Sequence, residues 1–284
     1  MTGRKKLKIS WGWFYTYFFM ILLVIFTALP IVYMTATSLK PLDELFLYPP
    51  RYLVRRPTLK NFAELMTTLD SQVVPFTRYL FNSIFTTAAT VAGTVAVCCL
   101  GAYAVEKVRM PGNKLIFNLV VAGLMFSPPA AQIPIYMAVS KLGMINSYWS
   151  LIIPGMAAPM YFFLVKQFAA QIPDSMIESA RIDGAGEFRI FASIAMPMLK
   201  SVWSTVIVFS FIANWNNSSG SIIYITNQSM KTLPYALSTI SDGGIARAGA
   251  AAAAAVLTTF PTIIVYLLMQ ARVLNTMAYA GIKG

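Results

Sequence analysis

Histidine is absent from the 284 residues of this chain, and charged residues make up only 11% of it. Without histidine, the chain lacks the commonest general base and a frequent metal ligand. A soluble domain carries about 25% charged residues, so this composition, with 57% hydrophobic residues, excludes an ordinary soluble domain. We therefore predict no catalytic residue, no cofactor and no metal site.

Further absences narrow the class of membrane protein. The chain has no G-x-x-x-x-G-K-S/T phosphate loop, so we do not expect it to bind or hydrolyse ATP by itself. No charged residue lies in the middle of an apolar run, whereas secondary transporters normally use buried charges for ion coupling. Cysteine occurs only as the adjacent Cys98 and Cys99, which favours two small buried hydrophobes over a disulfide or a metal pair.

Six long apolar runs are present, and about 20 such residues cross a bilayer as a helix. Backbone groups in lipid must be hydrogen-bonded within the protein, so each run should be helical. The expected fold is therefore all-α: a polytopic membrane protein with six transmembrane helices. The runs lie near residues 13–36, 80–104, 115–138, 148–169, 201–224 and 250–271.

The first run is preceded by a basic stretch and is too long for a cleavable signal, whose apolar core has about 7–15 residues. We expect a cytoplasmic tail at residues 1–12 and a single transmembrane domain over 13–284. With the N-terminus inside, 13 of the 22 Lys and Arg residues are cytoplasmic and nine are external. The bias is small, but the first helix usually sets orientation. Both termini are then cytoplasmic, with an external loop at 37–79 and a cytoplasmic loop at 170–200.

The net charge of +12 has two interpretations. A basic chain can bind nucleic acid, but in a polytopic protein positive charge more often marks cytoplasmic loops that face anionic lipid. We therefore predict the lipid bilayer, and no nucleic acid, as a partner.

The cytoplasmic loop at 170–200 is too patterned for a slack connector. Ser175 and Glu178 stand three residues apart, as in a capping box that starts a helix. Gly184 allows the chain to turn, because glycine tolerates left-handed backbone angles. A second short amphipathic helix should then carry Phe188, Phe191 and Ile194 or Ala195 on one side, and Pro197 should end it.

Three segments of this loop, Glu178-Ser179-Ala180, Asp183-Gly184-Ala185 and Ile194-Ala195-Met196-Pro197, resemble the coupling motif of ABC importer permeases. That pattern is roughly Glu-Ala-Ala, a glycine, and then Ile-x-Leu-Pro. Ser179 and Met196 depart from it but keep size and helix tolerance nearly intact. The resemblance implies that the loop docks into a groove on a separate ATPase subunit. The ATPase-coupling residues that it implies are Glu178, Ser179, Ala180, Asp183, Gly184, Ala185, Ile194 and Pro197.

The resemblance extends over nearly the whole chain, to the carbohydrate branch of these permeases and to the smaller membrane subunit of maltose-type importers. It implies a type I permease in a bacterial-type inner membrane. The implied partners are a second homologous permease, two ATP-binding cassette ATPase subunits and an extracytoplasmic solute-binding protein. The supporting stretches are 57–62, 82–83, 101–104, 133–136, 141–143, 146–149, 233–234 and 280–284.

Polar residues within the spans predict the substrate path. Amides and an indole suit a sugar, since hydroxyls bond to amides and the ring face stacks on aromatics, although Trp also anchors helices at membrane interfaces. The prolines after Ser127 either line a pore or make a static kink. Relatives usually have an acidic residue after Trp-Asn, whereas Asn217 stands here; this leaves the sugar open and is compatible with anionic saccharides. The predicted path residues are Asn82, Ser127, Trp215, Asn216 and Asn217.

Together these features predict the pore-forming subunit of an ATP-driven, binding-protein-dependent importer of sugars, of the oligosaccharide type. Two alternatives remain open: the same family with a polyol or glycerol phosphate as cargo, and, from another class, a secondary transporter. We also predict that Gly184→Trp leaves folding intact and uncouples transport.

Overall fold

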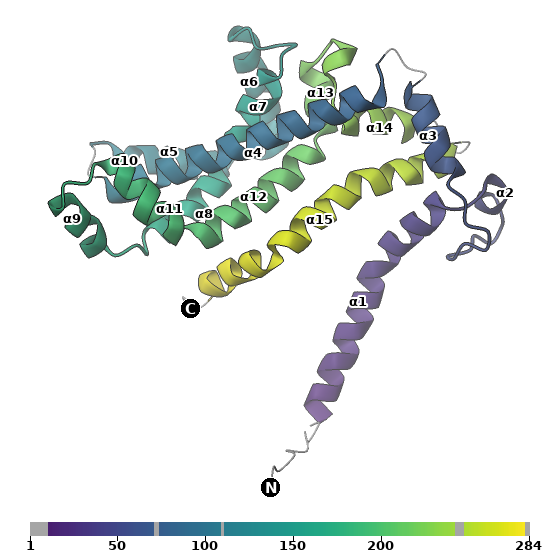
Figure 1. Cartoon of the computed structure of the whole chain (residues 1–284), viewed down its shortest axis with the longest axis horizontal. Helices are drawn as coiled ribbons and strands as arrows, with labels where there is room; N and C mark the ends of the chain where they lie inside the picture. Colours follow the sequence, from purple (N-terminus) through teal and green to yellow (C-terminus); the bar gives the residue numbers. More distant parts are fainter. Residues whose placement is uncertain (1–10, 71–73, 109–110, 242–246, 282–284) are drawn as a thin grey trace. The chain divides into compact units, whose positions relative to one another are not determined.

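The structure is a computed structural model that describes residues 11–70, 74–108, 111–241 and 247–281. Helices dominate these residues, and no strand occurs among them, so the predicted all-α fold is confirmed (Figure 1). The expected tail at 1–12 lies almost entirely outside the described residues.

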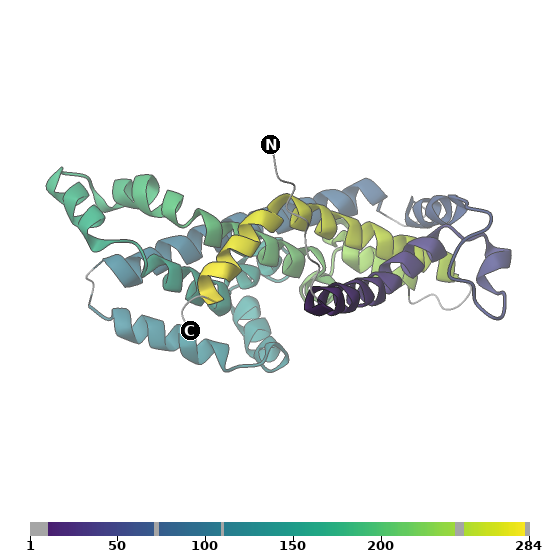
Figure 2. The same ribbon diagram turned by 90° about the horizontal axis from the view of Figure 1, so that it is seen from below.

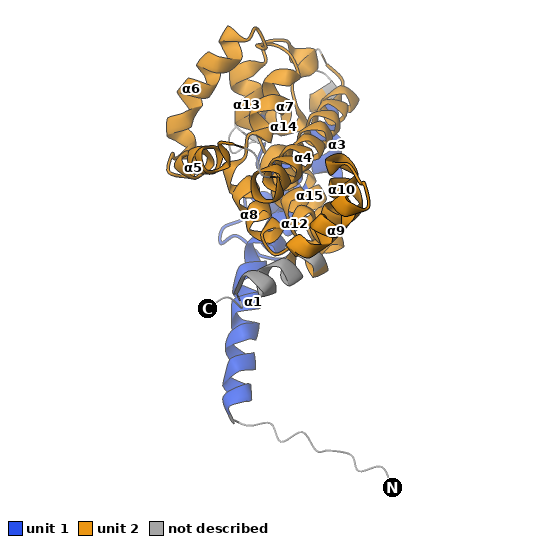
Figure 3. Ribbon diagram, turned by 90° about the vertical axis from the view of Figure 1, so that its left-hand side faces the viewer, with its two compact units in different colours: residues 1–67, 240–256 blue, residues 68–239, 257–284 orange. Residues whose placement is uncertain are grey.

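The chain divides into two compact units, coloured separately in Figure 3. Unit 1 comprises residues 1–67 and 240–256, and unit 2 comprises residues 68–239 and 257–284. The single transmembrane domain expected over 13–284 stays a prediction.

Unit 1 contains a folded segment after the first helix rather than a slack loop. The side-chain amide of Asn61 is buried and donates to the backbone carbonyls of Ser38 and Lys40, at 2.8 and 2.7 Å. The carboxylate of Glu44, also buried, accepts the backbone N–H groups of Arg55 and Arg56. These bonds fasten the segment to the end of the first helix. The elements are α1 (Trp11–Ser38), α2 (Leu42–Leu45), most of α3 (Lys60–Asp70) and the start of α15 (Ala248–Gly281).

Six potential spans are present among the described residues, as predicted. Three are single helices, α1, α4 (Phe76–Lys107) and α15. The other three are bent helix pairs, whose two helices meet at 118°, 43° and 79°. These pairs are α5 (Asn113–Leu124) with α6 (Pro128–Lys141), α7 (Trp149–Met156) with α8 (Pro159–Ala169), and residues 187–198 with α12 (Lys200–Trp215).

The breaks follow from the sequence. The first falls at residues 125–127, before Pro128-Pro129, and the second before Pro159; proline lacks the N–H that a helix interior needs. The predicted fifth span, 201–224, is wrong in its second half. Its helix ends at Trp215, and the carbonyl oxygen of the Asn217 side chain accepts the N–H of Gly220 at 2.9 Å. That cap starts a separate helix, α13 (Ser218–Tyr224).

The main apolar core of unit 2 joins α4 and α8 to the loop at 170–200. Cys98 and Cys99 lie in it and are fully buried free thiols, as predicted. After α13 come the short turn η2 (Gln228–Met230) and α14 (Leu233–Ser241).

Candidate functional site

The segment 170–200, called the coupling element from here on, forms a compact set of short helices at one end of α4 (Figures 1 and 2). It is not a straight continuation of either neighbouring span. Its elements are α9 (Asp174–Ile182), α10 (Glu187–Ile190), the π turn η1 (Phe191–Ala195) and α11 (Met196–Met198).

Gly184 makes the turn between the first two helices, as predicted. Its φ is +78°, in the left-handed region that glycine adopts without a Cβ penalty. The N–H of Ala185 donates to the carbonyl of Ala180, and the N–H of Gly184 to that of Arg181, both at 3.0 Å. This pair of bonds is a Schellman motif, which satisfies the last carbonyls of α9.

The helix start differs from the expectation. α9 begins at Asp174 after Pro173, and no side chain caps its N-terminus, so the capping box of Ser175 and Glu178 is wrong. The proline supplies the extended residue before the helix, and Asp174 in the first turn is favoured by the helix dipole. The hydroxyl of Ser179 bonds back to the carbonyl of Ser175 at 2.8 Å.

The inner face of the coupling element is buried against α4 and α8. Ile177, Ile190 and Ala195 are 0–2% exposed, and Phe191 is 8% exposed. Phe188 lies on the same side as Phe191, as expected, with ring centroids 6.4 Å apart, but it is 75% exposed, and Ile190 is the buried residue of α10. The π turn follows at Phe191–Ala195, and its i→i+5 bonds add a residue to one turn.

Besides this apolar packing, hydrogen bonds and ion pairs from the end of α4 hold the coupling element. The guanidinium of Arg181 donates to Glu187 at 2.7 Å and to the backbone carbonyl of Lys107 at 3.2 Å. The hydroxyl of Tyr103 donates to the same Glu187 carboxylate at 2.9 Å. The ammonium of Lys107 donates to Asp174 at 2.7 Å.

These contacts, the inner clamp of Tyr103, Lys107, Asp174, Arg181 and Glu187, are charge-assisted. Hydrogen bonding to Arg181 is the main cause that lowers the pKa of Glu187 below its usual range, and the same bond raises the pKa of Arg181. Sequence reasoning missed Tyr103, Asp174 and Glu187, because their partners lie up to 84 positions away in the chain.

The outer face carries most of the motif residues. Glu178, Ser179, Asp183 and Gly184 are exposed, while Ala180, Ala185 and Ile194 are half-buried beside the core. Three large apolar side chains also point outward without cover in this chain: Met176 is 44% exposed, Ile182 86% and Phe188 75%. The element is thus anchored on one side and offers a mixed polar and apolar surface on the other.

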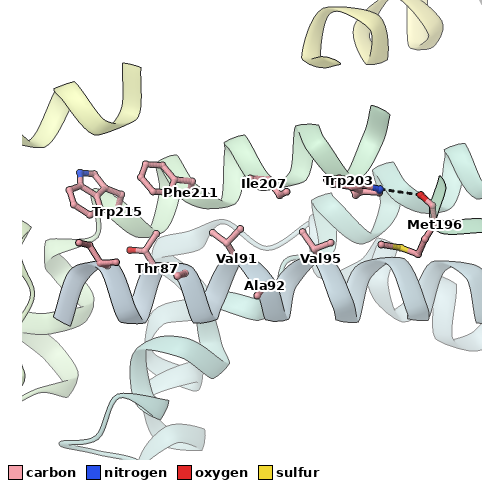
Figure 4. Close-up of a pocket in the computed structure, with 11 residues that line it drawn as sticks. Thr87, Val91, Ala92, Val95, Met196, Trp203, Ile207, Phe211 and Trp215 are labelled. Carbon is pink, nitrogen blue, oxygen red and sulfur yellow. Dashed lines mark hydrogen bonds between the residues drawn. The ribbon is translucent and has the colours of Figure 1, made fainter. Parts of the chain in front are cut away.

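Pro197 lies inside α11 rather than at its end. The chain turns two residues later, where Leu199 separates residues 187–198 from α12 and the axes meet at 79°. The π turn immediately before the proline accommodates its missing N–H. The indole N–H of Trp203 donates to the carbonyl of Met196 at 3.1 Å, which fixes this corner to α12 (Figure 4).

The predicted path residues do not lie together. Asn82 is fully buried, and its side-chain amide donates to the carbonyls of Ser229 and Lys231 at 2.9 and 2.8 Å. Its carbonyl oxygen accepts the hydroxyl of Tyr148 at 2.7 Å. In this conformation both donor protons of Asn82 are therefore used within the chain.

Trp215 lines an apolar groove of about 480 Å³ between α4 and α12, whose lining side chains are drawn in Figure 4. Its ring stacks on Phe211 at 5.6 Å between centroids, and its N–H donates to the carbonyl of Thr258 at 3.0 Å. The neighbouring Asn216 is exposed and bonds back to its own helix at Ile212. The apolar lining suits hydrocarbon or a helix rather than a sugar.

Asn217 lies in a different place, a cleft of about 370 Å³ formed by α6, α7 and α13, which we name the polar cleft for the few polar groups in its otherwise mostly apolar lining. Gln132, Ser219 and Tyr224 also line it, and none of its lining residues is charged. Pro154 in the wall leaves the carbonyl of Ser150, four residues earlier, without its helical donor. Ser127 caps α6 next to the two prolines of this wall but does not itself line the cleft.

The described residues contain no group of three or more His, Cys, Asp or Glu side chains that could hold a metal ion. A family model described as "Binding-protein-dependent transport system inner membrane component" matches residues 9–278. The chain belongs to this family. The family of ABC importer permeases that the coupling motif predicts is thereby confirmed, and the chain is a multi-pass protein of the inner membrane.

Curated relatives include proteins named as transport permeases. A glycerol-3-phosphate transport system permease, UgpE of Yersinia enterocolitica, is 35% identical over 69% of this chain and 70% of its own length. Protein LplC of Bacillus subtilis is 28% identical over 91% of this chain and 90% of its own. The probable ABC transporter permease YurM of the same organism is 26% identical over 94% and 87%.

Two solved structures share the fold of this permease. A chain of a bacterial ABC transporter involved in the import of the acidic polysaccharide alginate superposes with a TM-score of 0.80. It is 19% identical, and the match covers 95% of this chain and 99% of that one. A chain of an alginate transporter in complex with a periplasmic protein that carries an alginate pentasaccharide gives 0.59 at 14% identity, over 90% and 92%.

Proposed function

We propose that this chain is a pore-forming subunit of an ATP-driven importer and that its coupling element docks into a groove of an ATPase subunit. The complete importer contains a second homologous permease, two ATPase subunits in the cytoplasm and an extracytoplasmic solute-binding protein. Both termini lie in the cytoplasm. ATP is bound and hydrolysed by the partner subunits, and this chain is not an enzyme.

The observation that carries the docking proposal is the two-sided character of the coupling element. Its inner face is fixed by a buried core and by the inner clamp, while Ile182 and Phe188 stay open on the other side. Exposed apolar side chains on a polar segment mark a protein interface. A partner that closes on ATP binding and holds this surface moves the ends of the attached spans. ATP can shift the pore only through a difference in affinity for its two states.

We propose a saccharide as the cargo. The polar cleft around Asn217 supports this class, because amides, hydroxyls and a tyrosine are the groups that recognise sugar hydroxyls. Its lining carries no charge that would select for or against an anionic sugar. Asn217 is therefore the path residue that we assign to cargo contact.

A second candidate is glycerol phosphate, favoured by the 35% identity to a relative named for glycerol-3-phosphate transport. A phosphate is usually bound by Arg, Lys or a helix N-terminus. The start of α13 lines the polar cleft within residues 217–220, but this helix has only seven residues, and no Arg or Lys lines the cleft to add positive charge. The cleft therefore favours the saccharide.

The proposal is tested by purifying the importer through a tag on this chain and reconstituting it in vesicles. We expect an ATPase and a second permease to co-purify, and ATP-dependent uptake of a saccharide that the co-isolated binding protein selects in a ligand screen. Uptake of glycerol-3-phosphate without saccharides would replace the proposed cargo. A chain that purifies without ATPase activity would contradict the proposed mechanism.

A further inference from the structure

Helix α4 differs from the other spans of unit 2. It runs unbroken over 32 residues, a length of about 48 Å at 1.5 Å per residue. The spans that lie wholly within the described part of unit 2 are otherwise bent pairs, with breaks of 43° to 118°. In Figure 1 the coupling element lies at one end of α4, and α13 and α14 lie toward the other. α4 is therefore a straight connection between these two regions, and α12, unbroken over Lys200–Trp215, is a shorter one.

Near the start of α4, the adjacent residues Asn82 and Ser83 hydrogen-bond to the segment 226–233, called the outer segment from here on. Asn82 donates to the carbonyls of Ser229 and Lys231, and the Ser83 hydroxyl accepts the N–H of Leu233 at 2.7 Å. Asn82 and Ser83 are 0% and 1% exposed. Water cannot reach these two side chains to replace their hydrogen bonds. Removing either side chain therefore leaves backbone groups of the segment unpaired. The guanidinium of Arg78 adds a third bond, to Ser229 at 3.1 Å.

The inner end of α4 is fastened to the coupling element by Tyr103 and Lys107 of the inner clamp. Asn82 and Tyr103 are 21 positions apart on one continuous helix, about 31 Å along its axis. A helix with all its internal bonds intact does not shorten, whereas the bent spans can hinge at their breaks. A displacement at one end of α4 thus reaches the other end.

We propose that α4 is a rod that carries the movement of the coupling element to the outer segment 226–233, with Asn82 as the positioning residue that fastens this segment. The proposal rests on the proposed function, because the coupling element moves only if an ATPase holds it. It assigns Asn82 a part in transport without contact to cargo. Without the Asn82 bonds, the two ends of α4 would still move, but only Arg78 and Ser83 of α4 would hold the outer segment, which Asn146 also binds at residues 226 and 227.

The test measures a distance along this rod in the assembled importer. Spin labels are placed on Gln171→Cys in the coupling element and Thr226→Cys in the outer segment, both at exposed positions. The native Cys98 and Cys99 are fully buried and stay unlabelled. Pulsed electron paramagnetic resonance gives the distance without nucleotide and with ATP in EDTA, which prevents hydrolysis. We expect one narrow distance that is the same in both states.

The fastening is tested with Asn82→Leu, which keeps the branched shape, though not the smaller volume, and removes all three side-chain bonds. We expect ATP to shift or broaden the distance in this variant, and uptake per ATP hydrolysed to fall by about tenfold or more, since buried carbonyls lose their donors. Thr86→Val is the matched control. The Thr86 hydroxyl is buried one turn away and bonds only to carbonyls of α4 itself, so this variant should behave as wild type.

If Asn82→Leu does not assemble, Ser83→Ala removes only the bond to Leu233 and should show the same shift to a smaller extent. A wild-type distance that changes on ATP binding would overturn the rod. A variant at Asn82 that behaves like Thr86→Val would overturn its positioning role. ATPase activity is measured on the same samples: its absence from the wild type would overturn the proposed function instead.

Discussion

Substitutions at Gly184 could reduce coupling either by straining the backbone or by blocking a partner protein. Its left-handed backbone would strain any other residue by about 1–2 kcal/mol. A Cβ added there would meet nothing within 4 Å, so the space outside it is open in this chain. Side-chain size at this position is therefore limited only by a partner.

We expect Gly184→Ala and Gly184→Trp to lower the free energy of unfolding by similar amounts, because both residues are strained by the left-handed backbone at this position. Only the tryptophan fills the open space, so only this variant should lose ATP-coupled uptake. Uptake in vesicles and thermal unfolding of both variants measure the difference. Equal uptake by the two would show that nothing approaches Gly184.

The Arg181–Glu187 pair makes part of the stability depend on pH. Bonding to Arg181 lowers the pKa of Glu187, so its contribution is present above the unfolded glutamate value of about 4.3. It is lost as the pH falls through the lower folded value. Both side chains are about a third to a half exposed, and such pairs contribute about 0.2–1 kcal/mol.

We therefore expect wild type to unfold at a higher temperature than Glu187→Gln near neutral pH, and the gap to close below about pH 4. Thermal unfolding of both proteins across this range is the measurement. A gap that stays constant with pH would mean that the charge of Glu187 does not contribute.

Two glycines lie where helices pack closely, and their surroundings differ in how easily they can accommodate an added Cβ. At Gly155 in α7, a Cβ would come within 2.6 Å of Asn214 and 2.7 Å of Thr90. Both neighbours are held by hydrogen bonds to their own helices, at 2.8 and 2.7 Å. At Gly93 in α4, a Cβ would meet the end of the flexible Met156.

Gly155→Ala should therefore destabilise the protein by about 1–3 kcal/mol, as overpacking does. Gly93→Ala is its control and should cost less, because Met156 can move aside and alanine favours a helix by up to about 1 kcal/mol. The fraction that remains folded after heating in detergent compares the two. Equal losses would mean that α4, α7 and α12 do not pack as described.

The sequence predicts those helices whose position is decided by local composition. It does not predict helix ends and contacts that are decided by tertiary packing. Six apolar runs give six spans, and prolines mark the breaks before α6 and α8. The end of α12 at Trp215 was missed, because the apolar run continues through α13 while Asn217 starts a new helix. No local pattern could show that Asn82 bonds a segment almost 150 residues away.

The candidate site was predicted to a similar extent. The turn at Gly184 followed from glycine alone, and the resemblance placed the coupling motif on a surface element. The burial of Ile190 and the exposure of Phe188 did not follow, because the packing of α10 against α4 and α8 decides them, and no local pattern predicts the π turn before Pro197. The inner clamp needs α4 and the coupling element to be in place before its charges meet.

The whole molecule is a set of apolar spans, and the coupling element, a polar segment outside them, carries exposed apolar side chains. The family match and the shared fold make it one component of a larger assembly. Its own contacts fix the coupling element to α4 and leave Ile182 and Phe188 for a partner. The central claim is that this partner is the ATPase.

The most direct measurement places a photo-crosslinking amino acid at Phe188 in the intact importer, with Thr226 as an exposed control outside the coupling element. We expect irradiation to join Phe188 to the ATPase subunit and Thr226 to no ATPase. A crosslink from Phe188 to the extracytoplasmic binding protein, or to lipid alone, would contradict the account.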